Sequence, residues 1–308
     1  MMHFTPAPRP RLQGEPFFAG SEGEFHKTLA RFNQERFTPA NPGIVLFEPG
    51  NALRFHRMEV AFLEAMRQEA QTYLSENPAD PEDLVAWFES VASGAGEQAA
   101  AFFDWLAERA DSEQVRWVLQ QEIGAEAAVP DLLALSQVRM PARVKVAMAR
   151  AFWEEMGRGE EKATHSEMLE HLAHHFAIRA DLGAIIPEAM AQENLLNAMG
   201  AHRQYAFHAA GALGITALLN DERAPTMMRA LTRLKVPAKA RKVFAVQAAR
   251  DPAETRAWLD DVIAPLARRN TVRAQSLAEG AVMRLMAAAR CQEAYRLKFA
   301  SELQARRT

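Results

Sequence analysis

Helix signals follow one another along this sequence from Asn51 to its end. Apolar residues recur at helical spacing, and residues that start or stop helices stand between the apolar segments. No segment alternates apolar and polar residues over the length of a strand. The expected helices span about 51–74, 80 to the glycines at 94 and 96, 97–109, 112–137, 141–156, 161–178, 187–199, 202–219, 225–234, 237–250, 252–268 and 271–303. The sequence therefore predicts an all-α protein.

Abundant alanine supports the same fold class. Small residues favour the helix intrinsically, and they let neighbouring helices approach closely. No repeat of fixed period is visible, which argues against a solenoid of stacked repeats. We therefore expect a compact multi-helix bundle around one core.

The N-terminal segment differs from the rest of the chain. Its first twenty residues contain too many prolines and glycines for a helix and too few apolar residues for a strand. Ser21 and Glu24 then form a capping box, which predicts a helix to about Phe37. A short apolar run within 41–50 is the one plausible extended piece. We expect a Pro-rich arm over residues 1–22 and a single helical-bundle domain over residues 23–308.

Composition narrows the classes of function. The 308 residues are 49% hydrophobic, with 36 basic and 39 acidic side chains, so the formal net charge is −3. This balance lacks the basic excess of a nucleic-acid-binding protein. No run approaches the roughly 20 apolar residues of a membrane span, and the N-terminus has no apolar signal region. The lone Cys291 forms no internal disulfide, which predicts a cytoplasmic protein. A homodimer is the base-rate expectation for its assembly.

Sequence motifs exclude phosphate-loop chemistry. The chain contains no GxGxxG, GxxxxGK[ST], GxSxG or HExxH motif. It does contain many carboxylates and nine histidines. In a helical bundle such side chains can converge from different helices on a buried metal.

The first candidate ligands are Glu122 and Glu126, which lie one helical turn apart and therefore share a face. They point inward as ligands, or else they lie on a solvated side near Arg116.

The second candidates are Glu155 and His165. A helix ends at a glycine-rich turn between them and another begins, so both residues stand at the same corner. A carboxylate and an imidazole there suit a first-row metal such as iron. An ordinary surface corner is the alternative, because acidic residues are common at helix starts.

The sequence around this corner carries a family resemblance. The segment 153–168, with Glu155-Met-Gly-x-Gly and His165-Ser at its core, is followed by Asn-Leu-Leu-Asn at 194–197 and a helix over 205–219. Residues 112–270 together resemble the iron-containing redox enzyme family of heme-oxygenase-like non-heme diiron oxidases. The resemblance implies that Glu155 and His165 bind iron and that Glu122 comes from an earlier helix.

The last metal-binding helix departs from this family. The family has a histidine there, an aspartate four residues later and a second histidine three beyond that, and these positions fall on Gln247, Asp251 and Glu254. Only the aspartate is retained. Asp251-Pro252-Ala253-Glu254 also has the pattern of a helix start, with Asp251 as the N-cap. Asp251 is therefore either a ligand or a cap.

The resemblance implies an oxidoreductase in which two Fe(II) ions and O2 oxidise a small amine, amino acid or acyl substrate. The implied ligands are Glu122, Glu155, His165 and Asp251, with Glu254 as an additional carboxylate. A single metal or manganese is a variant, because oxygen ligands replace imidazoles. The main alternative is a metal-free relative that binds a small molecule or a protein. A metal-independent catalyst of the same fold is a third reading.

Overall fold

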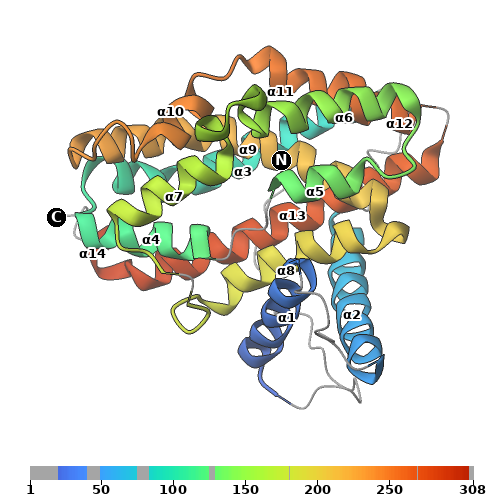
Figure 1. Ribbon diagram of the computed structural model, residues 1–308, viewed down its shortest axis with the longest axis horizontal. Helices are drawn as coiled ribbons and strands as arrows, with labels where there is room; N and C mark the ends of the chain where they lie inside the picture. Colours follow the sequence, from blue (N-terminus) through green and yellow to red (C-terminus); the bar gives the residue numbers. More distant parts are fainter. Residues whose placement is uncertain are drawn as a thin grey trace.

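The computed structural model describes residues 20–39, 49–74, 83–124, 129–179, 181–268 and 270–304, and every regular element within them is helical (Figure 1). The fold is therefore an all-α bundle, which confirms the prediction. Short 3-10 turns lie at Gly157–Gly159, Glu161–Ala163 and Arg203–Tyr205, and a π-helical segment lies at Leu259–Ile263. The α-helices are α1 (Glu22–Phe37), α2 (Pro49–Tyr73), α3 (Leu84–Glu108), α4 (Ser112–Gly124), α5 (Val129–Ser136), α6 (Ala142–Glu155), α7 (His165–His175), α8 (Pro187–Ala201), α9 (Ala206–Arg233), α10 (Lys242–Ala248), α11 (Pro252–Trp258), α12 (Ala264–Ala267), α13 (Thr271–Lys298) and α14 (Ala300–Gln304).

The two long helices α9 and α13 pack along each other at the centre of the bundle. At two places only glycine fits between them. A methyl group on Gly211 would overlap the backbone carbonyl of Leu277, and one on Gly280 would overlap the backbone of His208. The small residues expected to permit close helix contacts thus do so here, and they bring two backbones within contact distance.

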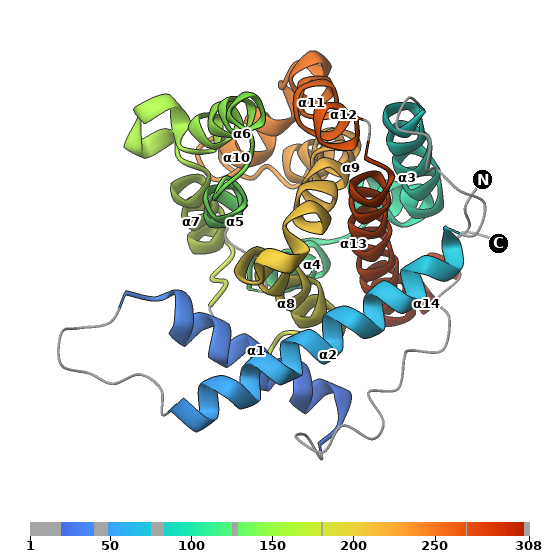
Figure 2. The ribbon, with the colours of Figure 1, turned by 90° about the vertical axis from the view of Figure 1, so that its right-hand side faces the viewer.

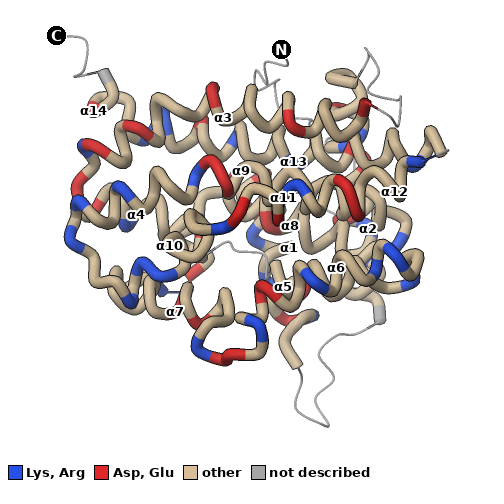
Figure 3. Tube along the Cα trace, turned by 90° about the horizontal axis from the view of Figure 1, so that it is seen from above, with Lys and Arg blue, Asp and Glu red and all other residues tan. Residues whose placement is uncertain are grey.

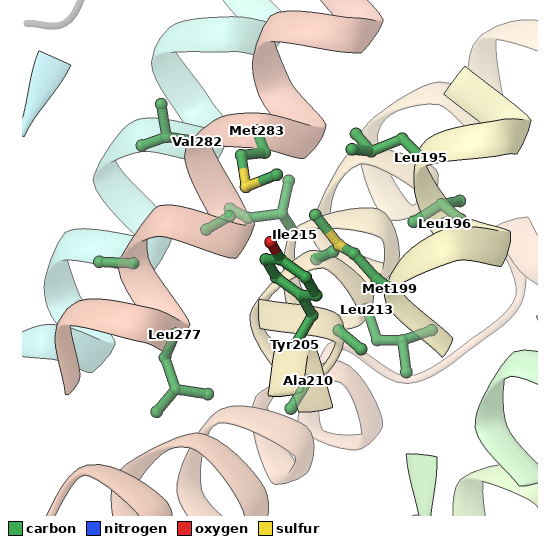
Figure 4. Close-up of a cluster of buried hydrophobic side chains, with 14 of the residues drawn as sticks. Leu195, Leu196, Met199, Tyr205, Ala210, Leu213, Ile215, Leu277, Val282 and Met283 are labelled. Carbon is green, nitrogen blue, oxygen red and sulfur yellow. The ribbon is translucent and has the colours of Figure 1, made fainter. Parts of the chain in front are cut away.

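Two clusters of buried hydrophobic side chains form the core. The first gathers residues of α2, α3, α8, α9 and α13, among them Phe88, Met199 and Met283. Figure 4 shows part of it, with α8 and α13 side chains around Tyr205 and Ile215. The second joins the end of α3 to α4, α7, α10 and the last turns of α13, and includes Phe102 and Leu172.

Helices α1 and α2 cover one side of the bundle (Figure 2). Both contact α8, and α2 also contacts α13. Arg36 of α1 donates two hydrogen bonds of 2.9 Å to Glu59 of α2, whose carboxylate also lies 2.8 Å from His202 Nε2. Asn33 donates to Asn194 of α8. These buried polar contacts fix α1 and α2 on the bundle.

Several predicted helix boundaries are wrong. Gly94 and Gly96 are expected to end a helix, but α3 runs through both. At Gly96 the carboxylate of Glu222 on α9 lies where a side chain would otherwise stand.

Pro225 is expected to start a helix, but it lies inside α9, where its neighbours Ala224 and Met227 are buried in the core. The core contacts on either side outweigh the hydrogen bond that the proline removes.

Two further boundaries differ. The helix expected over 112–137 is divided into α4 and α5, and α2 begins at Pro49 rather than being capped by Asn51. Ser21 does cap α1, and its hydroxyl accepts from the backbone N–H of Glu24. Most of the expected arm (1–19) and of the extended piece (40–48) lies outside the described residues. The division into an arm and one domain stays a prediction.

Charged residues of both signs are interspersed along the helices in Figure 3. Within the described ranges, no helix is both long enough and apolar enough to cross a bilayer.

Candidate functional site

A cavity of about 510 Å³ lies between the two hydrophobic clusters, because residues of both clusters line it. Its walls come from α3, α4, α6, α7, α8, α9, α10 and α13. The polar groups of the wall include amides and several carboxylates, among them Glu97, Glu122, Glu155 and Glu222. Arg223, Arg284 and His165 supply its basic groups. The cavity therefore combines apolar walls with a set of polar groups, a combination that is common in small-molecule sites.

A tight turn brings Glu155 and His165 together in this wall. Gly157, Arg158 and Gly159 all have positive φ values, of 63°, 54° and 90°. A Cβ on Gly157 would stand 2.5 Å from the backbone carbon of Ala163, so the chain reverses here only with glycine. Thr164 then caps α7, which begins at His165. The result is a distance of 3.3 Å between Glu155 Oε2 and His165 Nδ1.

The Glu155–His165 pair is partly enclosed, because its side chains are only 14% and 12% exposed. Arg250 donates a hydrogen bond of 3.0 Å from Nη2 to the other carboxylate oxygen, Glu155 Oε1. Gln247, three residues before Arg250, lines the cavity with its amide. The corner is thus part of the cavity wall rather than an ordinary surface turn.

Glu122 also lines the cavity, from the last turn of α4. It forms an ion pair with Arg223 of α9, whose guanidinium lies 5.5 Å from the ring centre of Phe244. Arg116, which one alternative placed beside Glu122, pairs with Glu113 instead. Glu126 lies outside the described residues.

Asp251 and Glu254 do not line the cavity. Asp251 caps α11, and its side chain accepts a hydrogen bond of 2.9 Å from the backbone N–H of Ala253. Glu254 is 46% exposed and lies 3.8 Å from Arg158. The prediction that Asp251 starts a helix is confirmed. In the part of the chain that the structure describes, no three His, Cys, Asp or Glu side chains come close enough together to hold a metal ion.

Helix α13 contributes cavity residues that the sequence reasoning missed. Arg284, Ala288 and Cys291 all line the cavity and follow one another at intervals of four and three residues. These residues supply a guanidinium, a methyl group and a thiol, so α13 adds a cation to the cavity wall.

Burial shifts the pKa values of three titratable side chains that α13 contributes to the cavity wall. Desolvation, with a contribution from the nearby charge of Arg223, lowers the pKa of Arg284 to about 10. Desolvation also raises the pKa of the Cys291 thiol to about 12 and holds the pKa of Tyr295 well above its usual value. Cys291 and Tyr295 therefore stay neutral at physiological pH.

On the α3 side of the cavity, partial burial raises the pKa of Glu222, and the charges of Glu97 and Asp221 act in the same direction. The negative charges of these two neighbours thus disfavour the ionised form of Glu222.

The fold and the cavity define a class: a helical bundle with a cavity whose wall includes carboxylates, a histidine and arginines. The model of a family described as iron-containing redox enzyme matches residues 116–289, which is more than half of the chain. The chain belongs to this family. No curated protein shows significant similarity to it. Family membership supports a general oxidoreductase-like role, and the family's name suggests iron.

Proposed function

We propose that this protein is an iron-dependent oxidoreductase that oxidises a small molecule with O2 in the cavity. The observation that carries the proposal is the Glu155–His165 pair, two ligand-type side chains 3.3 Å apart in the cavity wall. Iron as the metal rests on the family match together with this donor set, since carboxylate and imidazole suit iron.

The distance within the pair supports a shared ion. Two ligands that are each about 2.1 Å from one first-row metal, at an angle near 100°, stand roughly 3.2 Å apart. Glu155 Oε2 and His165 Nδ1 meet this requirement. Arg250 holds the other oxygen of Glu155 and so orients the carboxylate, as hydrogen-bonding partners of metal ligands commonly do.

The positions of the candidate ligands support one bound metal ion better than two. Glu122 lies in the same cavity but is paired with Arg223, and Asp251 and Glu254 lie outside the lining. We therefore propose Glu155 and His165 as the principal ligands and Glu122 as a third ligand that exchanges Arg223 for the metal. Manganese remains the alternative metal, because it accepts oxygen-rich sites.

Bound iron would supply the redox chemistry with O2. The chain's own residues hold and orient the substrate and exclude water, and the buried apolar wall around Leu119 and Leu196 serves the last purpose. A small amine, amino acid or acyl compound and O2 are the proposed partners, without nucleic acid, and the homodimer stays a prediction.

A second function is favoured by the arginines. Arg250 on Glu155 and Arg223 on Glu122 neutralise both carboxylates without a metal, and Gln247 offers a poor ligand. In this alternative the protein is a metal-free relative that binds a small molecule in the cavity.

Metal analysis separates the two functions. The full-length protein is reconstituted anaerobically with Fe(II), desalted, and analysed by plasma mass spectrometry. We expect about one iron per chain, because one carboxylate–imidazole pair is assembled. Glu155→Ala and His165→Ala should each abolish binding, and Glu122→Gln should weaken it.

Matched variants control for nonspecific effects. Glu154→Ala removes a neighbouring carboxylate that pairs with Arg158, and His174→Ala removes an exposed histidine of the same helix α7. Both should retain iron. If the wild type binds no iron or manganese, or if the control variants lose as much metal as the site variants, the metal-free alternative stands.

A further inference from the structure

Arg284 is a buried cation without an anionic partner. It is 8% exposed, in the middle of α13. Its Nε donates a hydrogen bond of 3.0 Å to Thr216 Oγ1, and its Nη1 donates one of 3.0 Å to Gln192 Oε1. Both acceptors are neutral. Among the described residues no carboxylate forms an ion pair with Arg284, although the same structure pairs Arg36, Arg223, Arg250 and Arg290 with carboxylates.

This arrangement is costly in the free protein. A charge that is removed from water normally acquires a counter-ion, because neutral dipoles replace only part of its hydration. The positive charge of Arg223 repels that of Arg284 and so lowers the pKa of Arg284. The two neutral hydrogen bonds nevertheless fix the plane of the guanidinium, and they leave its remaining N–H groups for another partner. Arg284 lines the cavity, so that partner can be a ligand.

We propose that Arg284 binds the carboxylate of the cavity's small-molecule substrate, which makes the substrate a carboxylic acid. The planar guanidinium matches a carboxylate with two parallel hydrogen bonds. Gln192 and Thr216 position Arg284 for this contact.

The charge of the cavity wall favours a carboxylate over phosphate. Glu97 and Glu222 line the same cavity, and Glu122 and Glu155 already occupy Arg223 and Arg250, so a dianion would meet more repulsion than a monoanion. A carboxylate carries one negative charge and replaces the counter-ion that Arg284 lacks. The rest of a substrate can lie along apolar wall residues such as Ile123, Leu169 and Leu219.

The inference names the substrate class of the site under "Proposed function" and rests on that site, but its test does not need iron. Hexanoate and its uncharged analogue hexanamide are titrated by calorimetry into the full-length protein, freed of metal with a chelator, at pH 7.5. Hexanoate should bind at least about tenfold more tightly than hexanamide, since the two differ only in the group that meets Arg284. Inorganic phosphate should bind more weakly than hexanoate.

Variants assign the effect to Arg284. Arg284→Met keeps an unbranched apolar stem but lacks the guanidinium, and it should remove the preference for hexanoate. The melting temperature of the free protein should be kept or raised, because a buried unpaired charge is gone. Arg296→Met, at an exposed position of the same helix, should bind hexanoate like the wild type.

The proposal is overturned if the wild type binds hexanoate and hexanamide equally, if phosphate binds more tightly, or if Arg284→Met keeps the hexanoate preference. The comparison of hexanoate with hexanamide uses the wild type, so it remains decisive if Arg284→Met fails to fold. Failure of the iron proposal has a different signature: metal is absent by mass spectrometry while hexanoate still binds.

Discussion

The α9–α13 pair has two halves with opposite character. In the sealed half, Ala206–Ile215 of α9 packs on Ala274–Met283 of α13, and glycines bring the backbones into contact. In the cavity half, residues of α9 from Thr216 onward and residues of α13 from Arg284 onward line the cavity. On each helix, close packing gives way to cavity lining within one turn. A single helix pair thus provides both the rigid centre of the fold and one wall of the site.

Each half has one carboxylate–histidine contact, and a comparison of the two contacts shows how the halves differ in role. In the sealed half, His208 Nε2 lies 3.1 Å from Glu279 Oε2, and the other oxygen of Glu279 accepts hydrogen bonds from Gln71 and Gln275. At the cavity, Glu155 and His165 are similarly close but more exposed: the side chain of Glu155 is 14% exposed against 5% for Glu279, and that of His165 is 12% exposed against 8% for His208. In the first contact, both carboxylate oxygens of Glu279 are bonded to protein groups, and the contact supports stability. The second borders the cavity, where a metal or substrate can reach it.

The largest expected effect concerns the sealed half. Gly211→Ala should lower the free energy of unfolding by about 3 kcal/mol, because the new methyl group meets the rigid backbone carbonyl of Leu277. Gly50→Ala, where no atom lies within 4 Å, should be neutral or stabilising by up to about 1 kcal/mol. Urea denaturation measures both. Equal stability of Gly211→Ala and wild type would show that the two helices are not held in contact.

The next effect compares the two carboxylates. Glu279→Ala should cost about 3 kcal/mol, because it leaves the buried His208 without its carboxylate and removes the acceptor of Gln71 and Gln275. Glu155→Ala should cost about 1 kcal/mol, since water in the cavity can replace part of what is lost. The measurement is again the free energy of unfolding in urea, for metal-free protein. A larger loss for Glu155→Ala would contradict the division into a structural and a functional pair.

The smallest expected effects are on the pH dependence of stability, which should change in opposite directions in Glu279→Gln and Glu222→Gln. Burial by itself would raise the pKa of Glu279, but hydrogen bonds from His208 and Gln71 outweigh it and hold the pKa below its usual value. Its ionised form therefore adds stability that is complete above about pH 4.5 and is lost as the pH falls through the folded-state pKa. Glu279→Gln should be less stable than wild type at pH 7, and the difference should shrink below pH ~4.5.

Glu222 at the cavity should show the reverse sign. Its pKa is raised by partial burial and by the charges of Glu97 and Asp221, so its ionisation costs stability as the pH rises above the unfolded-state value. Glu222→Gln should be slightly more stable than wild type at pH 7, and equal to it below pH ~4. Thermal melting between pH 3.5 and 7.5 follows both variants. Parallel curves for Glu279→Gln and Glu222→Gln would remove this distinction between the halves.

Local signals in the sequence predicted those elements that depend on neighbouring residues. Ser21 caps α1, Asp251 caps α11, and the glycine turn at Gly157–Gly159 sets Glu155 beside His165. Caps and turns involve only a few consecutive residues, so their chemistry is visible in the sequence.

The same rules failed where distant packing decides. Gly96 and Pro225 have the residue types that stop or start helices, but both lie inside long helices. Gly96 accommodates Glu222 from a helix more than a hundred residues away, and α9 continues past Pro225 because the side chains around it are buried. A pattern of nearby residues carries no information about such contacts.

For this protein, the sequence by itself determined an all-α chain and the corner that joins Glu155 to His165. Only the tertiary structure decided that Arg223 and Arg250 pair with the candidate ligands, that Asp251 stays outside the cavity, and that Arg284 is buried in its wall without a counter-ion. Helix formation follows from contacts three or four residues apart. The electrostatic environment of a side chain depends instead on groups that only the packing of helices brings near.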